Sequence, residues 1–199
     1  MKIIKLRYLI LLTAGYLLVS CSGKKSEEEE AANLFSFDKT KIGIEISDDV
    51  LGIKFNPPLD WELMPSSISK KIENRNNPSD GFIYEPVYIF FDKANGSVLS
   101  CGKVNSTDST ITTSSEINFY KGLLSTKYKN SNLSMNTFVH SRITFTLVKF
   151  DKENLRGSKL FFQNSRGQII QLEYSFRKDS EELVSPAIKA SIGSIRLLN

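Results

Sequence analysis

The chain has 199 residues, of which 26 are lysine or arginine and 22 are aspartate or glutamate, so its formal net charge at pH 7 is +4. Lys2, Lys5 and Arg7 are the only charged side chains among the first 20 residues, which leaves 23 basic and 22 acidic residues in the remainder. This near-neutral remainder gives no electrostatic basis for binding nucleic acid. Its length is sufficient for one domain with an adequate apolar core and no disulfides.

The first 20 residues have the pattern of a secretory signal peptide. Three basic residues precede an almost wholly apolar stretch at 8–19. This stretch is shorter than the roughly 20 residues that a membrane-spanning helix needs. It closes in Leu18-Val19-Ser20-Cys21, which resembles the bacterial lipobox, the motif at which a diacylglycerol is attached to a cysteine before cleavage. An uncleaved transmembrane anchor with a chance cysteine at its end is the alternative interpretation.

The lipobox resemblance implies that residues 1–20 are removed and that Cys21 is the lipid attachment site. Such lipoproteins usually carry a further amide-linked acyl chain, such as palmitate, and two or more chains hold a protein stably on a membrane. The remaining cysteine, Cys101, then has no partner for an internal disulfide.

The segment Ser22 to Asn33 predicts a flexible tether, because it lacks apolar periodicity and contains four consecutive glutamates, Glu27 to Glu30. Ser22 is not the aspartate that retains enteric lipoproteins in the inner membrane, which favours the outer membrane. The acidic run also resembles the surface-export signal of lipoproteins in the Bacteroidota. Both a periplasmic and a cell-surface location therefore remain open.

The folded domain is expected over residues 34–199, beginning with a hairpin. Alternating apolar residues predict a strand at 41–46, a turn at 47–49 and a second strand at 50–55. Pro57 and Pro58 then exclude a central strand and lead to Trp61, the only tryptophan.

The middle of the chain predicts alternating helices and strands. The expected elements are a short helix at 65–72, a turn-rich stretch at 74–81, a central strand at 84–91, a turn at 92–96, a strand at 98–104 and a polar loop at 105–113. Thr113 and Glu116 fit a capping box at the start of a helix. An apolar stripe at three- and four-residue spacing continues that helix, formed by Ile117, Tyr120, Leu124 and Tyr128.

From Thr137 onward the pattern changes to strands, closed by one more helix. Side chains of one face are Ile143, Phe145 and Leu147, and those of the other are Arg142, Thr144 and Thr146. Residues 164–167 predict a turn between strands at 159–163 and 168–176. Ser185-Pro186 is predicted to start a helix that points Ile188 and Ile192 inward and ends at Gly193, before a terminal strand at 195–198.

This order of elements resembles the Mog1/PsbP-like family. The resemblance covers roughly residues 40–199 and depends on two motifs, the proline-tryptophan segment Pro57-Pro58-Leu59-Asp60-Trp61 and the closing segment Ser185 to Ile195. It implies an α+β fold, an α/β/α sandwich with a central antiparallel sheet. The family is mostly non-catalytic, and its members bind different partners, so the resemblance assigns no binding residue.

Three pairs of residues could carry chemistry. Cys101 and His140 could form a nucleophilic pair, although a strand cysteine is more often a small buried hydrophobe. Asp48 and Asp49 could act as paired carboxylates, although adjacent acids in a turn are mostly solvated. Trp61 and Tyr84 could line a ligand groove, although the tryptophan is better explained as a cap on the core.

The sequence therefore predicts a lipid-anchored, non-enzymatic accessory or binding module of the cell envelope. Its expected partners are the membrane, which it contacts through the lipid, and an envelope protein. No cofactor is expected. No metal site is expected either, because one cysteine and one histidine do not make a ligand set. The alternative is a carrier of a small hydrophobic ligand in a pocket between sheet and helix. An enzyme of unfamiliar type is the third hypothesis.

Overall fold

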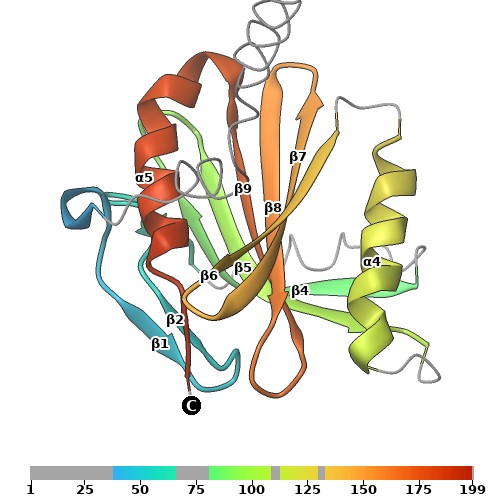
Figure 1. Cartoon of the computed structure of the whole chain (residues 1–199). Helices are drawn as coiled ribbons and strands as arrows, with labels where there is room; N and C mark the ends of the chain where they lie inside the picture. The colour runs from blue at the N-terminus through green and yellow to red at the C-terminus, as the bar shows by residue number, and fades with distance from the viewer. Residues whose placement is uncertain (1–37, 66–80, 109–112, 130–132, 199) are drawn as a thin grey trace, which may run out of the picture. The chain divides into compact units, whose positions relative to one another are not determined.

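A computed structural model describes residues 38–65, 81–108, 113–129 and 133–198. The largest element in these ranges is a seven-stranded, fully antiparallel sheet with the strand order β3-β4-β5-β9-β8-β7-β6 (Figure 1). The strands are β3 (Glu62–Leu63), β4 (Phe82–Phe91), β5 (Val98–Ser106), β6 (Ser134–His140), β7 (Ile143–Lys152), β8 (Leu155–Gln163) and β9 (Ile169–Arg177).

A small second sheet joins the two ends of the described chain. It has the order β1-β2-β10 and is also antiparallel. The remaining elements of the fold are β1 (Ile46–Asp48), β2 (Ile53–Phe55), β10 (Arg196–Leu197), the helices α4 (Thr113–Lys127) and α5 (Glu181–Gly193), and the 3-10 helices η1 (Lys39–Lys41) and η2 (Lys178–Ser180).

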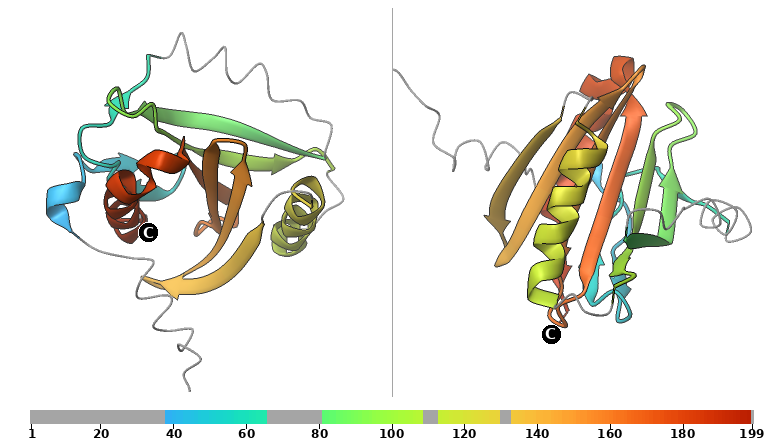
Figure 2. Two further views of the ribbon diagram at one scale, coloured as in Figure 1. Left: turned by 90° about the horizontal axis from the view of Figure 1, so that it is seen from above. Right: turned by 90° about the vertical axis from the view of Figure 1, so that its right-hand side faces the viewer.

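The two helices cover opposite faces of the seven-stranded sheet (Figure 2). Alternate residues of β9 show this directly, since successive side chains of a strand point to opposite faces. Ile169 belongs to the cluster that packs beneath α4, whereas the Tyr174 hydroxyl shares a 3.1 Å hydrogen bond with Ser191 of α5. We refer to these as the α4 face and the α5 face.

The small sheet lies on the α5 face, where Phe55 of β2 makes edge-on ring contacts with Tyr88 and Phe90 of β4. Asn56 ties the small sheet to α5, because its backbone N–H donates to Ser194 Oγ and its carbonyl accepts from Ser191 Oγ. The core of this face consists of completely buried side chains, among them Phe145, Phe162, Leu99, Leu160, Leu172 and Tyr174.

Several predicted elements are confirmed. The α+β sandwich with an antiparallel central sheet is present, as are the N-terminal hairpin, the helix that begins at Thr113 and the hairpin around residues 164–167. In that last turn Gly167 has a φ of 76°, the backbone conformation that favours glycine. Gly193 is the last residue of α5, and Ile188 and Ile192 are buried.

The first hairpin has different bounds from those predicted. The predicted strand at 41–46 is shorter and lies later: residues 39–41 form a 3-10 helix, and β1 spans 46–48. The turn, predicted at 47–49, comes after β1. The side chain of Asp48 accepts a 2.7 Å hydrogen bond from the Leu51 N–H, and Gly52 has a φ of 65°. Aspartate favours turns because its side chain can accept a hydrogen bond from a backbone N–H that follows it, and glycine favours them because it tolerates a positive φ. These two residues explain why the chain reverses direction at 49–52.

The prediction that the strand at 84–91 is central was wrong. Among the described strands, β4 has only the two-residue β3 on its outer side, and β9 is the middle strand. Pro86 explains the position of β4, because proline lacks a donor for the sheet and is tolerated near edges and bulges. The register between β4 and β5 does shift between Pro86 and Tyr88.

Two further boundaries differ. α5 begins at Glu181, so Pro186 lies inside the helix and does not start it. Arg142 lies in the turn between β6 and β7 and does not share a strand face with Thr144, and Thr146 is buried on the α4 face. The predicted helix at 65–72, most of the turn at 74–81 and the capping side chain of Thr113 lie outside the described residues.

Candidate functional site

The helix α4 attaches to the sheet through the apolar stripe that the sequence predicts. Tyr120 and Leu124 are buried, and they pack on the strand residues Val104, Val148, Phe161 and Ile169. The Tyr120 ring lies 5.2 Å from both the Phe82 ring and the Phe161 ring, measured between centroids. These contacts fix the axis of the helix above the sheet and leave its outer flank beside the start of β4.

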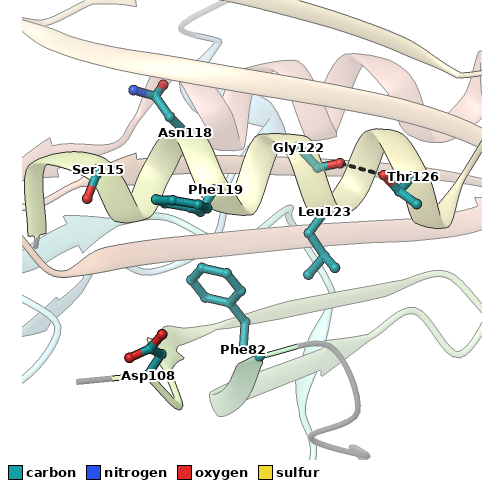
Figure 3. A pocket seen from close by; sticks show the side chains of 9 residues that line it. Phe82, Asp108, Ser115, Asn118, Phe119, Gly122, Leu123 and Thr126 are labelled. Atoms are coloured by element: carbon teal, nitrogen blue, oxygen red, sulfur yellow. Dashed lines mark hydrogen bonds between the residues drawn. The ribbon is translucent and has the colours of Figure 1, made fainter. Parts of the chain in front are cut away.

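A pocket of about 680 Å³ lies along that flank, between α4 and the first residues of β4 (Figure 3). We call it the α4 pocket. Its lining residues are Gly81, Phe82, Asp108, Ser115, Asn118, Phe119, Gly122, Leu123 and Thr126. The volume is within the range of roughly 300–1,000 Å³ that is typical of small-molecule sites.

The α4 pocket has an apolar middle and a polar end. In Figure 3 the Phe82 ring and the Leu123 side chain approach one another between strand and helix, with Phe119 beside them. Asp108 and Ser115 lie toward one end. The Thr126 hydroxyl donates to the Gly122 carbonyl at 3.1 Å. A Cβ added at Gly122, which lines the pocket, would meet nothing within 4 Å, so the space beside this residue is open.

A row of polar side chains lies on the sheet beneath α4. Tyr120 donates to Gln171 Oε1 at 2.5 Å, and Lys159 donates to Glu173 Oε2 at 2.6 Å. Gln171 is completely buried. A separate hydrogen bond of 2.7 Å joins the hydroxyls of Tyr84 and Ser100.

Three of these polar groups, Tyr84, Tyr120 and Lys159, have pKa values above their ordinary ones. Burial raises the pKa of Tyr120 to about 12, so its hydroxyl stays protonated at neutral pH. Burial acts to lower the pKa of Lys159, but Glu173 together with Tyr120 and Tyr128 outweighs burial, and the net pKa lies above the ordinary value. Burial raises the pKa of Tyr84 as well. These three side chains therefore stay protonated at neutral pH and can act as hydrogen-bond donors.

The structure does not bring Cys101 and His140 together. Cys101 lies on β5 and is completely buried, and burial raises the pKa of its thiol well above the usual value. His140 ends β6, with β9, β8 and β7 between that strand and β5. Its Nε2 is 3.2 Å from the carbonyl oxygen of Gly193. A buried neutral thiol without this base is a packing residue.

The other residues that the sequence offered as functional candidates make contacts within the fold. Asp48 accepts hydrogen bonds of 2.7 Å from the Leu51 N–H and from the Tyr88 hydroxyl, so it does not act with Asp49 as a carboxylate pair. Burial, followed by the bond to Asp48, raises the pKa of Tyr88 to about 12. Trp61 is buried just before β3, and neither it nor Tyr84 lines the α4 pocket. Cys21 lies outside the described residues.

Sequence reasoning missed the residues of the α4 pocket. Two signals were available on the helix itself. Phe119 lies outside the apolar stripe of α4 and is 58% exposed, and Gly122 occupies a mid-helix position where glycine is unfavourable. An exposed aromatic side chain one helical turn from a glycine indicates an apolar patch on the helix beside a position that has no side chain.

Within the described ranges no three side chains of the metal-binding types lie close enough to hold an ion. No helix in the same ranges has the length and apolarity that crossing a membrane requires.

Comparisons with known proteins identify the fold. No protein-family model and no curated protein sequence matches the chain. Among solved structures, that of cyanobacterial PsbP (CyanoP) from Synechocystis is similar with a TM-score of 0.52 and 16% identity, over 83% of this chain and 99% of that one.

Two other solved structures are less similar. LpqN, involved in cell envelope biogenesis of Mycobacterium tuberculosis, has a TM-score of 0.48 and 16% identity, over 74% of this chain and 83% of that one. A Bacteroides thetaiotaomicron protein has a TM-score of 0.35 and 12% identity, over 74% and 46%. The similarity to CyanoP shows that the chain has a PsbP-like fold.

Proposed function

We propose that the protein is a lipid-anchored accessory or binding module of the bacterial cell envelope and is not an enzyme. The observation that carries the proposal is the Leu18-Val19-Ser20-Cys21 motif, placed between an apolar stretch and a charged, aperiodic segment. Residues 1–20 are the signal peptide, 21–33 the tether and 34–199 a single domain. Two acyl-bearing groups on Cys21 would suffice for stable anchoring.

The positions of the reactive side chains support a binding role. Cys101 is buried and neutral, and His140 is held near the C-terminal end of α5. Asp48 is used in a turn. The α4 pocket, by contrast, has an open apolar surface of a kind that binds without chemistry.

Lipidation is tested by feeding cells an alkyne-bearing palmitate and detecting the label on the protein. The wild type should be labelled, and Cys21→Ser should not be. Ser22→Ala, one residue away and outside the motif, is the matched control and should be labelled like the wild type. Label on Cys21→Ser would contradict lipid attachment at Cys21, whereas a wild type without label would favour the uncleaved anchor.

The tether and the anchor place the domain on the outer membrane in this proposal, facing either the periplasm or the exterior. Protease treatment of intact cells separates the two orientations. Cleavage of the tether without lysis would indicate the cell surface and make surface capture the role to pursue. Protection until lysis would indicate the periplasm and a partner in envelope assembly.

A second candidate function, carriage of a small hydrophobic ligand, is favoured by the α4 pocket. Its volume of about 680 Å³ and its apolar middle at Phe82, Phe119 and Leu123 suit an acyl or aromatic group. Dansylundecanoic acid, a fluorescent fatty-acid probe, can measure this in the purified full-length protein. Gly122→Phe should fill the pocket and abolish binding, whereas Gly122→Ala should retain it. Equal binding by the two variants would contradict carriage at this site.

A further inference from the structure

Strand β6 forms one edge of the seven-stranded sheet. It is the last strand in the order and pairs with β7 from Ser134 to His140 without a shift of register. No other described strand pairs with its outer side. An edge strand of this length presents a row of backbone donors and acceptors to any strand that fits.

The turn after β6 shows which residues of β6 direct their backbone N–H and C=O groups away from β7. Ser141 and Arg142 form a two-residue connection with φ values of 51° and 67°, which match a type I′ hairpin turn. Such a turn closes with hydrogen bonds between the flanking pair, His140 and Ile143. Because bonded and non-bonded pairs alternate along an antiparallel ladder, the N–H and C=O groups of Met135, Thr137 and Val139 point away from β7.

The features that usually block an open edge are missing from β6. The strand contains no proline, lysine, arginine, aspartate, glutamate or bulge. Val139 is 66% exposed although it is apolar. At the opposite edge, β3 covers only Phe90 and Phe91 of β4, and the rest of β4 contains Pro86 and a shift of register between Pro86 and Tyr88. Proline and bulges hinder strand pairing, so β6 is the more open of the two described edges.

We propose that β6 is a dimerisation edge, which pairs antiparallel with β6 of a second copy of the chain about a twofold axis at Thr137. In this register Thr137 faces the partner's Thr137, and Met135 faces the partner's Val139. The three outward residues are symmetric about Thr137, so each pair exchanges two backbone hydrogen bonds. The threonine pair is a favourable cross-strand pair, and the methionine meets a valine, which brings two apolar side chains together.

A second copy fits this edge better than a charged partner does. The outward residues carry no charge, so two copies approach without like-charge repulsion, and the symmetric spacing makes the strand complementary to itself. The interface is small, because one seven-residue strand buries less than the roughly 1,200 Å² of a stable complex. We therefore expect a weak dimer that forms and separates reversibly.

Thr137→Cys tests the register in the full-length protein in host membranes. The two cysteines would lie across the axis with their Cα atoms about 5.5 Å apart, a separation that a disulfide can span. Mild oxidation should give a covalent dimer. Thr144→Cys is the matched control, because Thr144 is an exposed threonine of the same face on β7, one strand further from the axis. It should remain monomeric, as should the parent chain with Cys21 and Cys101 alone.

Thr137→Lys tests the same interface without a cross-link. Two lysines would meet at the axis, and sedimentation of the detergent-solubilised protein should shift from dimer to monomer with an unchanged melting curve. Thr144→Lys should sediment like the wild type. The proposal is overturned if Thr137→Cys gives no more dimer than Thr144→Cys, or if it cross-links to a different envelope protein and not to itself.

Discussion

The α5 face and the α4 face of the sheet are built from the same strands but differ in kind. Along β9, Leu172 and Tyr174 are completely buried on the α5 face. Gln171 and Glu173, on the α4 face, take part in hydrogen bonds instead. The α5 face is covered by a helix and a second sheet, whereas α4 leaves a pocket beside β4. The α5 face is thus the more completely apolar and buried of the two, whereas the α4 face combines an apolar cluster with polar side chains and an open pocket.

The ion pair on the α4 face agrees with this division. Lys159 and Glu173 are partly exposed, with side-chain exposures of 12% and 24%. Their attraction is offset by the cost of removing both charges from water, so the pair adds little net stability. A sheet face selected for stability alone would carry apolar side chains at these positions, as the α5 face does.

The largest predicted change in stability comes from replacing one buried phenylalanine on the α5 face, compared with one exposed phenylalanine on the α4 face. Phe162→Ala removes a completely buried ring that packs edge-on against Phe145, and it should lower the free energy of unfolding by about 3–5 kcal/mol. Phe119→Ala, at an exposed position in the α4 pocket, should change it by no more than about 0.5 kcal/mol. Urea denaturation of both variants measures the difference. Equal losses would mean that the α4 pocket is part of the core.

Two glycines give the next comparison, this time within the α4 face. A Cβ at Gly157 would lie 2.2 Å from Cζ of Phe150, whose ring stacks on Tyr128, so Gly157→Ala should destabilise the protein by about 1–3 kcal/mol. Gly122→Ala meets open space and should stabilise it by roughly 0.5–1 kcal/mol, because alanine favours a helix. Thermal melts of the two variants should shift in opposite directions. A shared direction would show that the pocket at Gly122 is closed in solution.

Removal of one hydroxyl tests the polar row. Tyr120→Phe leaves the ring in place but deletes the hydrogen bond to Gln171, whose amide oxygen is buried. The loss should be about 1 kcal/mol in urea denaturation. Ser125→Ala, which removes an exposed hydroxyl of the same helix that bonds only the Lys121 carbonyl, is the control and should be nearly neutral. An unchanged Tyr120→Phe variant would mean that water replaces the hydroxyl.

The sequence predicted elements whose signals are local. The stripe from Ile117 to Tyr128 and the turn at Gly167 follow from spacing and from backbone preference, and both are confirmed. It offered a pocket between sheet and helix only as an alternative, and it did not predict the residues that line the α4 pocket, because Phe82 and Phe119 are far apart in the sequence and come together only when α4 lies beside β4. The placement of β4 near an edge likewise depends on the strand order, although Pro86 was a local signal for it.

The smallest effect concerns the attachment of α5. Asp151 on β7 accepts hydrogen bonds of 2.8 and 3.1 Å from Arg156, which also contacts Glu181 at the start of α5. The bonds from Arg156 hold the pKa of Asp151 below its ordinary value of 3.8. A lowered pKa in the folded state means that the stabilisation is complete above the unfolded pKa, near about 4, and is lost as pH falls through the folded value.

Asp151→Asn should therefore destabilise the protein at neutral pH by roughly 0.5 kcal/mol, the scale of a partly exposed ion pair. The difference from the wild type should shrink as the pH falls below about 4, the pKa of the unfolded carboxylate, and disappear below the lower folded pKa. Asp49→Asn, at an exposed turn position, serves as the control for the general effect of removing a charge. Melting temperatures measured from pH 7 to pH 2.5 follow this convergence. A constant difference across that range would show that Asp151 acts through its shape and not its charge, and any acid sensitivity in the attachment of α5 would then come from Glu181, the other carboxylate that contacts Arg156.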